Sequence, residues 1–167
     1  MLFHVSEEST IDRFEPRASE YTKGPVVWAI DAEHLRNYLV PRQCPRVTFY
    51  AGSDTSPEDI ERFLGASPAV IAIESHWFEQ LRSCRLYCYH LPPETFESFD
   101  KLAGYFVSHV PVVPTFIEVF DDPIDELLRR GVELRFTPDL WPLRDAVVTS
   151  TLQYSIIRMR NAMRAPI

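Results

Sequence analysis

The chain has 167 residues, of which 46% are hydrophobic and 25% are charged, which fits a single folded domain spanning residues 1–167 and excludes a disordered protein. Its formal net charge of −7 disfavours nucleic acid as a partner, because phosphate binding depends on Lys and Arg. The apolar runs are far shorter than the ~20 residues that cross a bilayer, so no membrane span is predicted.

Short runs rich in Val, Ile, Phe and Tyr predict β-strands along the whole chain. Gly and Pro between these runs are typical of turns. The predicted strands are residues 2–6, 26–30, 46–51, 69–74, 85–91, 105–107, 112–120 and 132–136.

Polar residues followed by Pro predict where helices begin. Ser56 can cap a helix whose first residue is Pro57. Asp122 can cap a second helix, which Gly131 would end. We therefore expect short helices after both capping residues.

The final segment predicts the longest helix. Thr137 and Pro138 can start it, and from residue 140 to residue 163 no glycine occurs while apolar residues recur at roughly helical spacing. Strands mixed irregularly with short helices, without a steady βαβ period, indicate an α+β fold. We expect small mixed or antiparallel sheets with short helices and a long C-terminal helix.

The first strand carries a histidine that could face a ligand cleft. His4 and Ser6 are one pleat apart and share a face, so an imidazole and a hydroxyl could line the same site. Trp28, in the second strand, could stack on a nicotinamide or a base. Each of these two side chains could instead be a core residue, and the residues alone favour the core for both His4 and Trp28.

The cysteines do not have the spacing of a metal site. Cys84 and Cys88 would lie ~13 Å apart along a strand, too far to share one zinc ion. We therefore predict no metal and no required cofactor. Glu118, within a strand-like run, could act as a general base if buried, or lie on a solvent face.

Glycine and cysteine usage narrows the function and the location. The five glycines are too dispersed for a G-x-G-x-x-G or Walker loop, which excludes Rossmann and P-loop nucleotide sites. Three cysteines cannot all pair, and acidic residues at positions 7, 8 and 12 do not fit a secretory signal. A cytoplasmic protein is predicted.

Several short motifs resemble known families. The N-terminal arrangement resembles the start of ADP-ribosyltransferase-like folds, over residues 2–40 and more loosely 103–120. The chain as a whole also resembles a family of uncharacterised bacterial proteins, through residues 46–52 and 140–145. The motifs that carry the first resemblance are Phe3-His4-Val5-Ser6, Phe14-Glu15-Pro16-Arg17 and Val26-Val27-Trp28-Ala29, followed by His34 and Leu35.

The ADP-ribosyltransferase resemblance implies two small sheets around a cleft for NAD or ADP-ribose. His4 matches the first family position, which would contact a ribose beside Ser6, and Arg17 would hold a phosphate. Trp28 falls near the second position, where the family has Tyr or Ser. The third position falls near residues 104–107, where this chain has no glutamate, so the family's carboxylate is missing or lies elsewhere. If transfer chemistry occurs, a carboxylate such as Glu118 would stabilise a cationic sugar.

Two functions of other classes fit the same sequence. A non-enzymatic binding module would use its aromatic residues, 13% of the chain, for packing and an oligomer interface. Trp77, Phe78 or Trp141 would then lie in an exposed patch. An RNA-processing enzyme would need basic residues in the cleft, which the acidic composition disfavours. The substrate, the activity and the oligomeric state stay open.

Overall fold

The structure is a computed structural model that describes residues 1–163. Contacts divide the chain into two compact units, each assembled from two separate segments. Unit 1 contains Met1–Leu39 and Arg85–Asp121, and unit 2 contains Val40–Cys84 and the chain from Asp122 onward. The expectation of a single domain over residues 1–167 stays a prediction.

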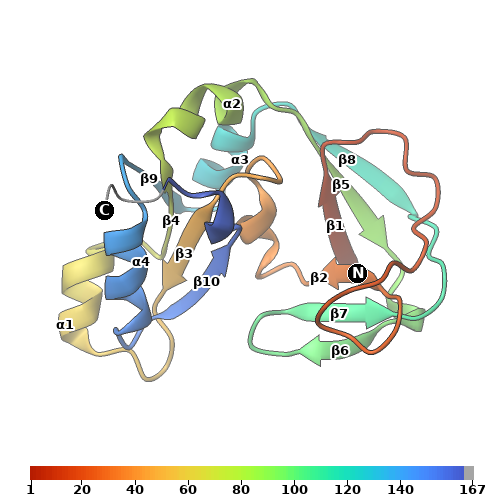
Figure 1. Ribbon diagram of the computed structural model, residues 1–167, viewed down its shortest axis with the longest axis horizontal. Helices are drawn as coiled ribbons and strands as arrows, with labels where there is room; N and C mark the ends of the chain where they lie inside the picture. Colours follow the sequence, from red (N-terminus) through yellow and green to blue (C-terminus); the bar gives the residue numbers. More distant parts are fainter. Residues whose placement is uncertain (164–167) are drawn as a thin grey trace. The chain divides into compact units, whose positions relative to one another are not determined.

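The predicted α+β class is confirmed. Residues 1–163 form ten strands in two sheets, together with four short α-helices (Figure 1). No helix within these residues combines the length and apolar character needed to cross a membrane. Single-turn helical segments lie at Leu35–Tyr38, Ile60–Leu64, Ser75–Trp77, Pro93–Thr95 and Met159–Asn161.

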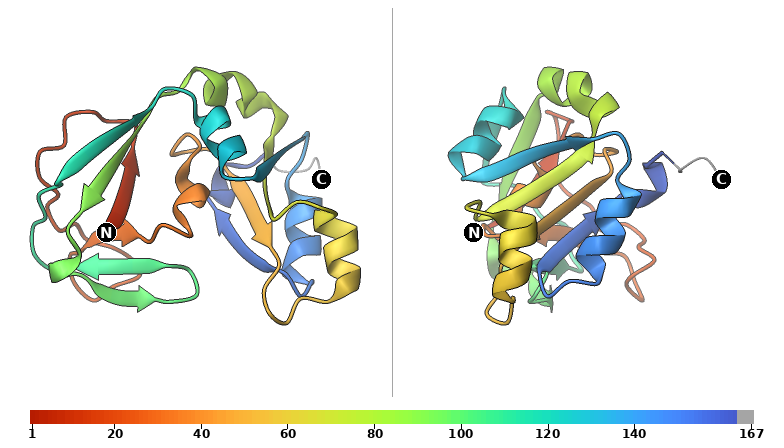
Figure 2. Two further views of the ribbon diagram at one scale, coloured as in Figure 1. Left: turned by 180° about the vertical axis from the view of Figure 1, so that it is seen from behind. Right: turned by 90° about the vertical axis from the view of Figure 1, so that its left-hand side faces the viewer.

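Unit 1 is built on a six-stranded sheet of order β6-β7-β2-β1-β5-β8, in which all neighbouring strands are antiparallel. The hairpin of β6 and β7 forms one edge of this sheet, as the left view of Figure 2 shows, and β8 forms the other. The strands are β1 (Leu2–Ser6), β2 (Val27–Ile30), β5 (Leu86–Leu91), β6 (Glu97–Asp100), β7 (Tyr105–Ser108) and β8 (Phe116–Phe120).

Side-chain alternation divides this sheet into two faces. One face packs on Phe14 and Val112 from the connecting segments, and we call it the core face. We call the other the aromatic face, since most of its partly exposed side chains are rings. The core face carries Leu2, Val27, Ala29, Tyr89 and Leu91, and the aromatic face carries Phe3, Trp28, Cys88, His90, Tyr105, Phe116 and Glu118.

Unit 2 contains a four-stranded sheet of order β10-β3-β4-β9, in which only β4 and β9 are parallel. α4 and the helical turn after α1 pack on one face of this sheet through a single apolar core. The elements are β3 (Arg46–Tyr50), β4 (Ala69–Glu74), β9 (Val132–Thr137), β10 (Gln153–Ile157), α1 (Pro57–Asp59), α2 (Phe78–Ser83), α3 (Pro123–Arg129) and α4 (Trp141–Val148).

The two short helices begin where the sequence predicts. The Ser56 hydroxyl accepts a hydrogen bond from the backbone N–H of Asp59 at the start of α1. The Asp122 carboxylate accepts from two backbone N–H groups at the start of α3. Gly131 follows α3 with a φ of 73°, a left-handed conformation that suits glycine at a helix C-terminus.

The prediction of a long C-terminal helix is wrong. α4 ends at Val148, and residues 153–157 form β10, which pairs with β3. Hydroxyl groups satisfy carbonyls of the last turn of α4: Thr149 donates to the carbonyl of Asp145, and Ser150 donates to that of Val147. The apolar residues beyond find partners on the sheet of unit 2, so tertiary pairing overrides a pattern that suits a helix equally well.

Candidate functional site

The sheet of unit 1 separates the site residues that the sequence predicts. His4 and Ser6 point to the core face, whereas Trp28 and Glu118 point to the aromatic face. His4 and Glu118 therefore lie on opposite sides of one sheet and do not converge. Their individual roles in ligand binding stay predictions.

The segment that contains β2 changes its pairing partner along its length. At Ile30 it pairs with Phe3 of β1, whereas Val26, immediately before β2, pairs with Arg17 through backbone hydrogen bonds of 2.9 and 3.0 Å. Paired residues share a face, so Arg17 is on the same face as Val26 and, two residues further on, Trp28. Arg17 and Trp28 are thus diagonal neighbours, a relation in which residues typically lie about 7–8 Å apart and their Cβ atoms somewhat closer.

His4 occupies the place where β1 and β2 diverge. Its Nδ1 lies 3.0 Å from the carbonyl oxygen of Trp28, and since a carbonyl only accepts, Nδ1–H is the donor. The imidazole also packs against Phe14, with ring centroids 4.8 Å apart. His4 therefore holds the backbone of Trp28 from the core face, while the indole projects from the other face.

Trp28 is the centre of a partly exposed aromatic surface. Phe99 and Tyr105 contact its indole in edge-to-face geometry, with centroid distances of 4.9 and 5.8 Å. The hydroxyls of Tyr105 and Tyr38 are hydrogen-bonded at 2.6 Å, which fixes the orientation of Tyr105. Phe99 is 46% exposed, and Trp28 is half-buried. Planar rings such as nucleic-acid bases stack on surfaces of this kind.

A second group on the aromatic face has ligands suited to a metal ion. One ligand atom from each of Cys88, His90 and Glu118 lies within 4.8 Å of the others. Sequence reasoning paired Cys88 with Cys84 and missed this group, because Glu118 comes from a strand distant in sequence. The available signal was the Cys-x-His alternation of β5, which places both side chains on one face.

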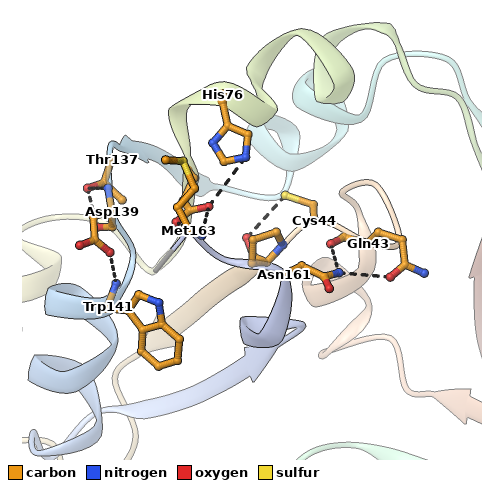
Figure 3. A network of polar contacts seen from close by, with 10 residues as sticks. Gln43, Cys44, His76, Thr137, Asp139, Trp141, Asn161 and Met163 are labelled. Carbon is orange, nitrogen blue, oxygen red and sulfur yellow. Dashed lines mark hydrogen bonds and ion pairs between the residues drawn. The ribbon is translucent and has the colours of Figure 1, made fainter. Parts of the chain in front are cut away.

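In unit 2, a buried carboxylate lies where the parallel strands β4 and β9 end. Glu74, paired in register with Thr137, is fully buried and accepts hydrogen bonds of 3.0 and 3.1 Å from the backbone N–H of Met163. The Nε2 of His76 lies 3.9 Å from the same carboxylate. Dashed lines from His76 and from Met163 mark these contacts in Figure 3. Glu74 therefore anchors the segment that follows β10.

Two further contacts shape this part of unit 2 (Figure 3). The Asn161 side chain donates to the backbone carbonyl of Gln43 at 2.7 Å, a second attachment of the segment after β10. Between β9 and α4, the Asp139 carboxylate accepts from the backbone N–H of Trp141 at 2.9 Å. The main partners of these polar groups are backbone groups, so we interpret the network as one that stabilises the fold and not as a ligand site.

Cys44, beside this network, is a buried thiol. Burial raises its pKa from 9.0 to about 12, although the nearby Arg46 guanidinium acts in the opposite direction. The thiol donates to the carbonyl of Pro45 at 3.5 Å. Cys44 is therefore neutral in the folded protein at physiological pH and is not a nucleophile there.

The raised pKa of Cys44 predicts a loss of stability in alkali. Above pH 9.0 the unfolded chain releases the thiol proton first, whereas the folded chain keeps it until about 12. The free energy of unfolding should therefore fall with rising pH in this window, by about 1.4 kcal/mol per pH unit from this group. Urea denaturation of wild type and Cys44→Ala at several alkaline pH values measures the difference. Parallel pH profiles would contradict the prediction.

The protein is an α+β protein whose unit 1 sheet carries two candidate ligand sites on its aromatic face. One is the aromatic surface around Trp28, and the other is the group of Cys88, His90 and Glu118. The chain belongs to a family of unknown function, DUF6886, whose model matches residues 3–162. No curated protein and no solved structure matches the chain significantly. The prediction of an uncharacterised family is confirmed, whereas bacterial origin, a cytoplasmic location and the ADP-ribosyltransferase likeness stay predictions.

Proposed function

We propose that unit 1 binds a nucleotide on the aromatic face of its sheet, with NAD or ADP-ribose as the ligand class that the N-terminal motifs suggest. The observation that carries this proposal is the diagonal placement of Arg17 and Trp28 on one face. An indole and a guanidinium at this separation fit a planar base and its attached phosphate.

Each partner has the chemistry that its role needs. Stacking of a base on an aromatic side chain contributes about 1–3 kcal/mol and requires only a partly exposed ring. Arg17 is exposed, and within residues 1–163 no acidic side chain lies within ion-pair distance of its guanidinium. A guanidinium with this freedom can bind phosphate oxygens in a bidentate manner. The nearby Arg13 differs, because it is paired with Glu15 at 2.7 Å.

The proposal assigns His4 a positioning role through the carbonyl of Trp28, supported by their 3.0 Å contact. Glu118 shares the aromatic face but lies three strand spacings from Trp28, about 14 Å across the sheet. Transfer chemistry at Glu118 would require a ligand that extends across β1 and β5. We therefore propose nucleotide binding and assign no catalytic step.

Calorimetric titration with NAD, ADP-ribose, AMP and adenosine tests the proposal. Trp28→Ala should weaken binding of all four at least ~10-fold, the equivalent of about 1.4 kcal/mol of lost stacking. Arg17→Ala should weaken the phosphate-containing ligands and leave adenosine unchanged. Arg13→Ala, in the same segment but already paired, is the matched control and should bind like wild type.

Two results would overturn nucleotide binding. One is the absence of heat with every nucleotide at millimolar concentration, and the other is an affinity that neither Trp28→Ala nor Arg17→Ala changes. Circular dichroism of each variant establishes that the fold is retained, so that a loss of binding reports on the site.

A second candidate function, a non-enzymatic interaction module, is favoured by strand β8. This strand is an edge of the sheet, and its apolar side chains Phe116, Ile117 and Val119 are 59%, 37% and 46% exposed. An exposed apolar edge strand can pair with a strand of another chain. Concentration-dependent size in light scattering, together with no nucleotide binding, would favour this alternative.

A further inference from the structure

We propose that Cys88, His90 and Glu118 form a binding site for a divalent transition-metal ion of the zinc type on the aromatic face of unit 1. The proposal does not depend on nucleotide binding, because it involves different residues and its test needs no nucleotide.

Strand geometry brings the three side chains together. Cys88 of β5 is directly opposite Glu118 of β8, and such pairs have Cβ atoms about 4.5–5.5 Å apart. His90 is two residues further along β5 and therefore points to the same face. Since both strands belong to one ladder, the arrangement is set by backbone pairing and not by a loop.

The distances fit a common ion. The Nε2 of His90 and Oε2 of Glu118 are 3.3 Å apart. Two ligands of one tetrahedral zinc ion, with bonds of ~2.0–2.2 Å, lie about 3.4 Å apart, so the observed separation matches. All three ligand atoms lie within 4.8 Å of one another. A rotation of the Cys88 side chain would bring its thiol closer to an ion held by His90 and Glu118.

The surroundings hold the histidine in place. Its ring lies between Phe3 of β1 and Phe116 of β8, in edge contacts with centroid distances of 5.0 and 5.2 Å. These contacts restrict rotation of the imidazole and keep Nε2 directed toward Glu118. Rigid placement of a ligand before the ion binds lowers the entropy cost of binding.

Burial is graded across the three ligands. Cys88 is fully buried, whereas the side chains of His90 and Glu118 are 22% and 47% exposed. A bound ion would therefore have protein ligands on the sheet side and solvent on the other. Three protein ligands with a fourth position for water are typical of reactive zinc sites, whereas structural sites have four protein ligands.

The donor set indicates which ions fit. A thiolate and an imidazole favour zinc, cobalt and similar ions, whereas Mg²⁺ and Ca²⁺ require oxygen ligands. The exposed pair of His109 and Glu97 provides an internal comparison. Its ring nitrogen and carboxylate oxygen are also 3.3 Å apart, but among the described residues no cysteine joins this pair to form a metal-ligating group. Of these two groups, the Cys88 group is the one that should bind a thiophilic ion.

Titration of the purified, reduced full chain with Co²⁺ tests the proposal. We expect one ion per chain, a thiolate-to-cobalt charge-transfer band, and displacement of the band by Zn²⁺. Cys88→Ser should abolish this band. His90→Gln and Glu118→Gln should each weaken Co²⁺ binding by more than the ~10–100-fold cost of losing a group that only orients a ligand.

Two variants are matched controls. Cys84→Ser removes a partly exposed thiol outside the proposed site, and His109→Gln disrupts the comparison pair, so both should keep the wild-type band and stoichiometry. Glu118 is nearly half exposed, so Glu118→Gln keeps the proposal testable even if Cys88→Ser does not fold. The proposal is overturned if wild type gives no charge-transfer band, or if the band persists in Cys88→Ser and disappears in Cys84→Ser.

Discussion

Gly104→Ala is expected to destabilise the protein by roughly 2–5 kcal/mol, through backbone strain and a steric clash together. Gly104 has a φ of 70°, which side chains other than glycine rarely adopt. A Cβ at this position would lie 2.7 Å from Oδ2 of Asp31, and it would also meet Nδ1 of His34. Both contacts are too close to persist without movement.

Movement of these side chains has its own cost. The Asp31 carboxylate accepts hydrogen bonds of 2.8 Å from both the backbone N–H and the ring Nδ1–H of His34, and His34 is buried. The backbone N–H of Asp31 also donates to the carbonyl of Gly104 at 3.1 Å. A substitution at Gly104 therefore disturbs a hydrogen-bonded corner immediately after β2.

Two other glycines separate the strain from the clash. Gly65 has a positive φ of 57° with nothing within 4 Å of an added Cβ, so Gly65→Ala should cost only the backbone strain, about 1–3 kcal/mol. Gly24 has neither feature, so Gly24→Ala should be close to neutral. Urea denaturation of the three variants gives the comparison. Equal losses for Gly104→Ala and Gly65→Ala would show that the corner relaxes without cost.

Phe49→Ala is expected to destabilise unit 2 by about 3–5 kcal/mol, the cost of removing a fully buried aromatic ring from a close-packed core. Phe49 lies on β3 between β10 and β4 and is 0% exposed. Its ring contacts Phe63 edge-to-face at 6.2 Å, and the Arg135 guanidinium lies 5.6 Å from its centroid. Few neighbours can move to fill the resulting cavity, because this core also holds the helix packing of unit 2.

Phe136 is the matched control for this substitution. It lies on β9 of the same sheet but is 40% exposed, so Phe136→Ala should cost roughly 1 kcal/mol. Urea denaturation midpoints of the two variants give the comparison. Equal losses of stability in the two variants would show that burial is not the main way in which the Phe49 ring stabilises unit 2.

Local chemistry alone was enough to predict most of the secondary structure. β-Branched and aromatic runs identified β1 and β4 with the bounds that the structure has. Ser56 and Asp122 identified two helix starts, because a capping side chain acts on backbone N–H groups within its own turn. β6 was not predicted, since all its residues are exposed and no apolar alternation marks it.

The candidate sites depend on pairing between distant segments, which one sequence does not encode locally. His4 is close to Trp28 because β1 and β2 diverge, and Glu118 is opposite Cys88 because β5 pairs with β8 in one register. A shift of one residue in that register would move Glu118 to the core face.

The sequence by itself determined the α+β class, the acidic surface character, most strands and two helix starts. Only the tertiary structure decided that residues 153–157 extend a sheet, that His4 and Glu118 face opposite ways, and that a Cys–His–Glu group forms on one face. The reason is physical: propensity and capping act within a few residues, whereas strand pairing and register depend on which distant partner buries the most apolar surface.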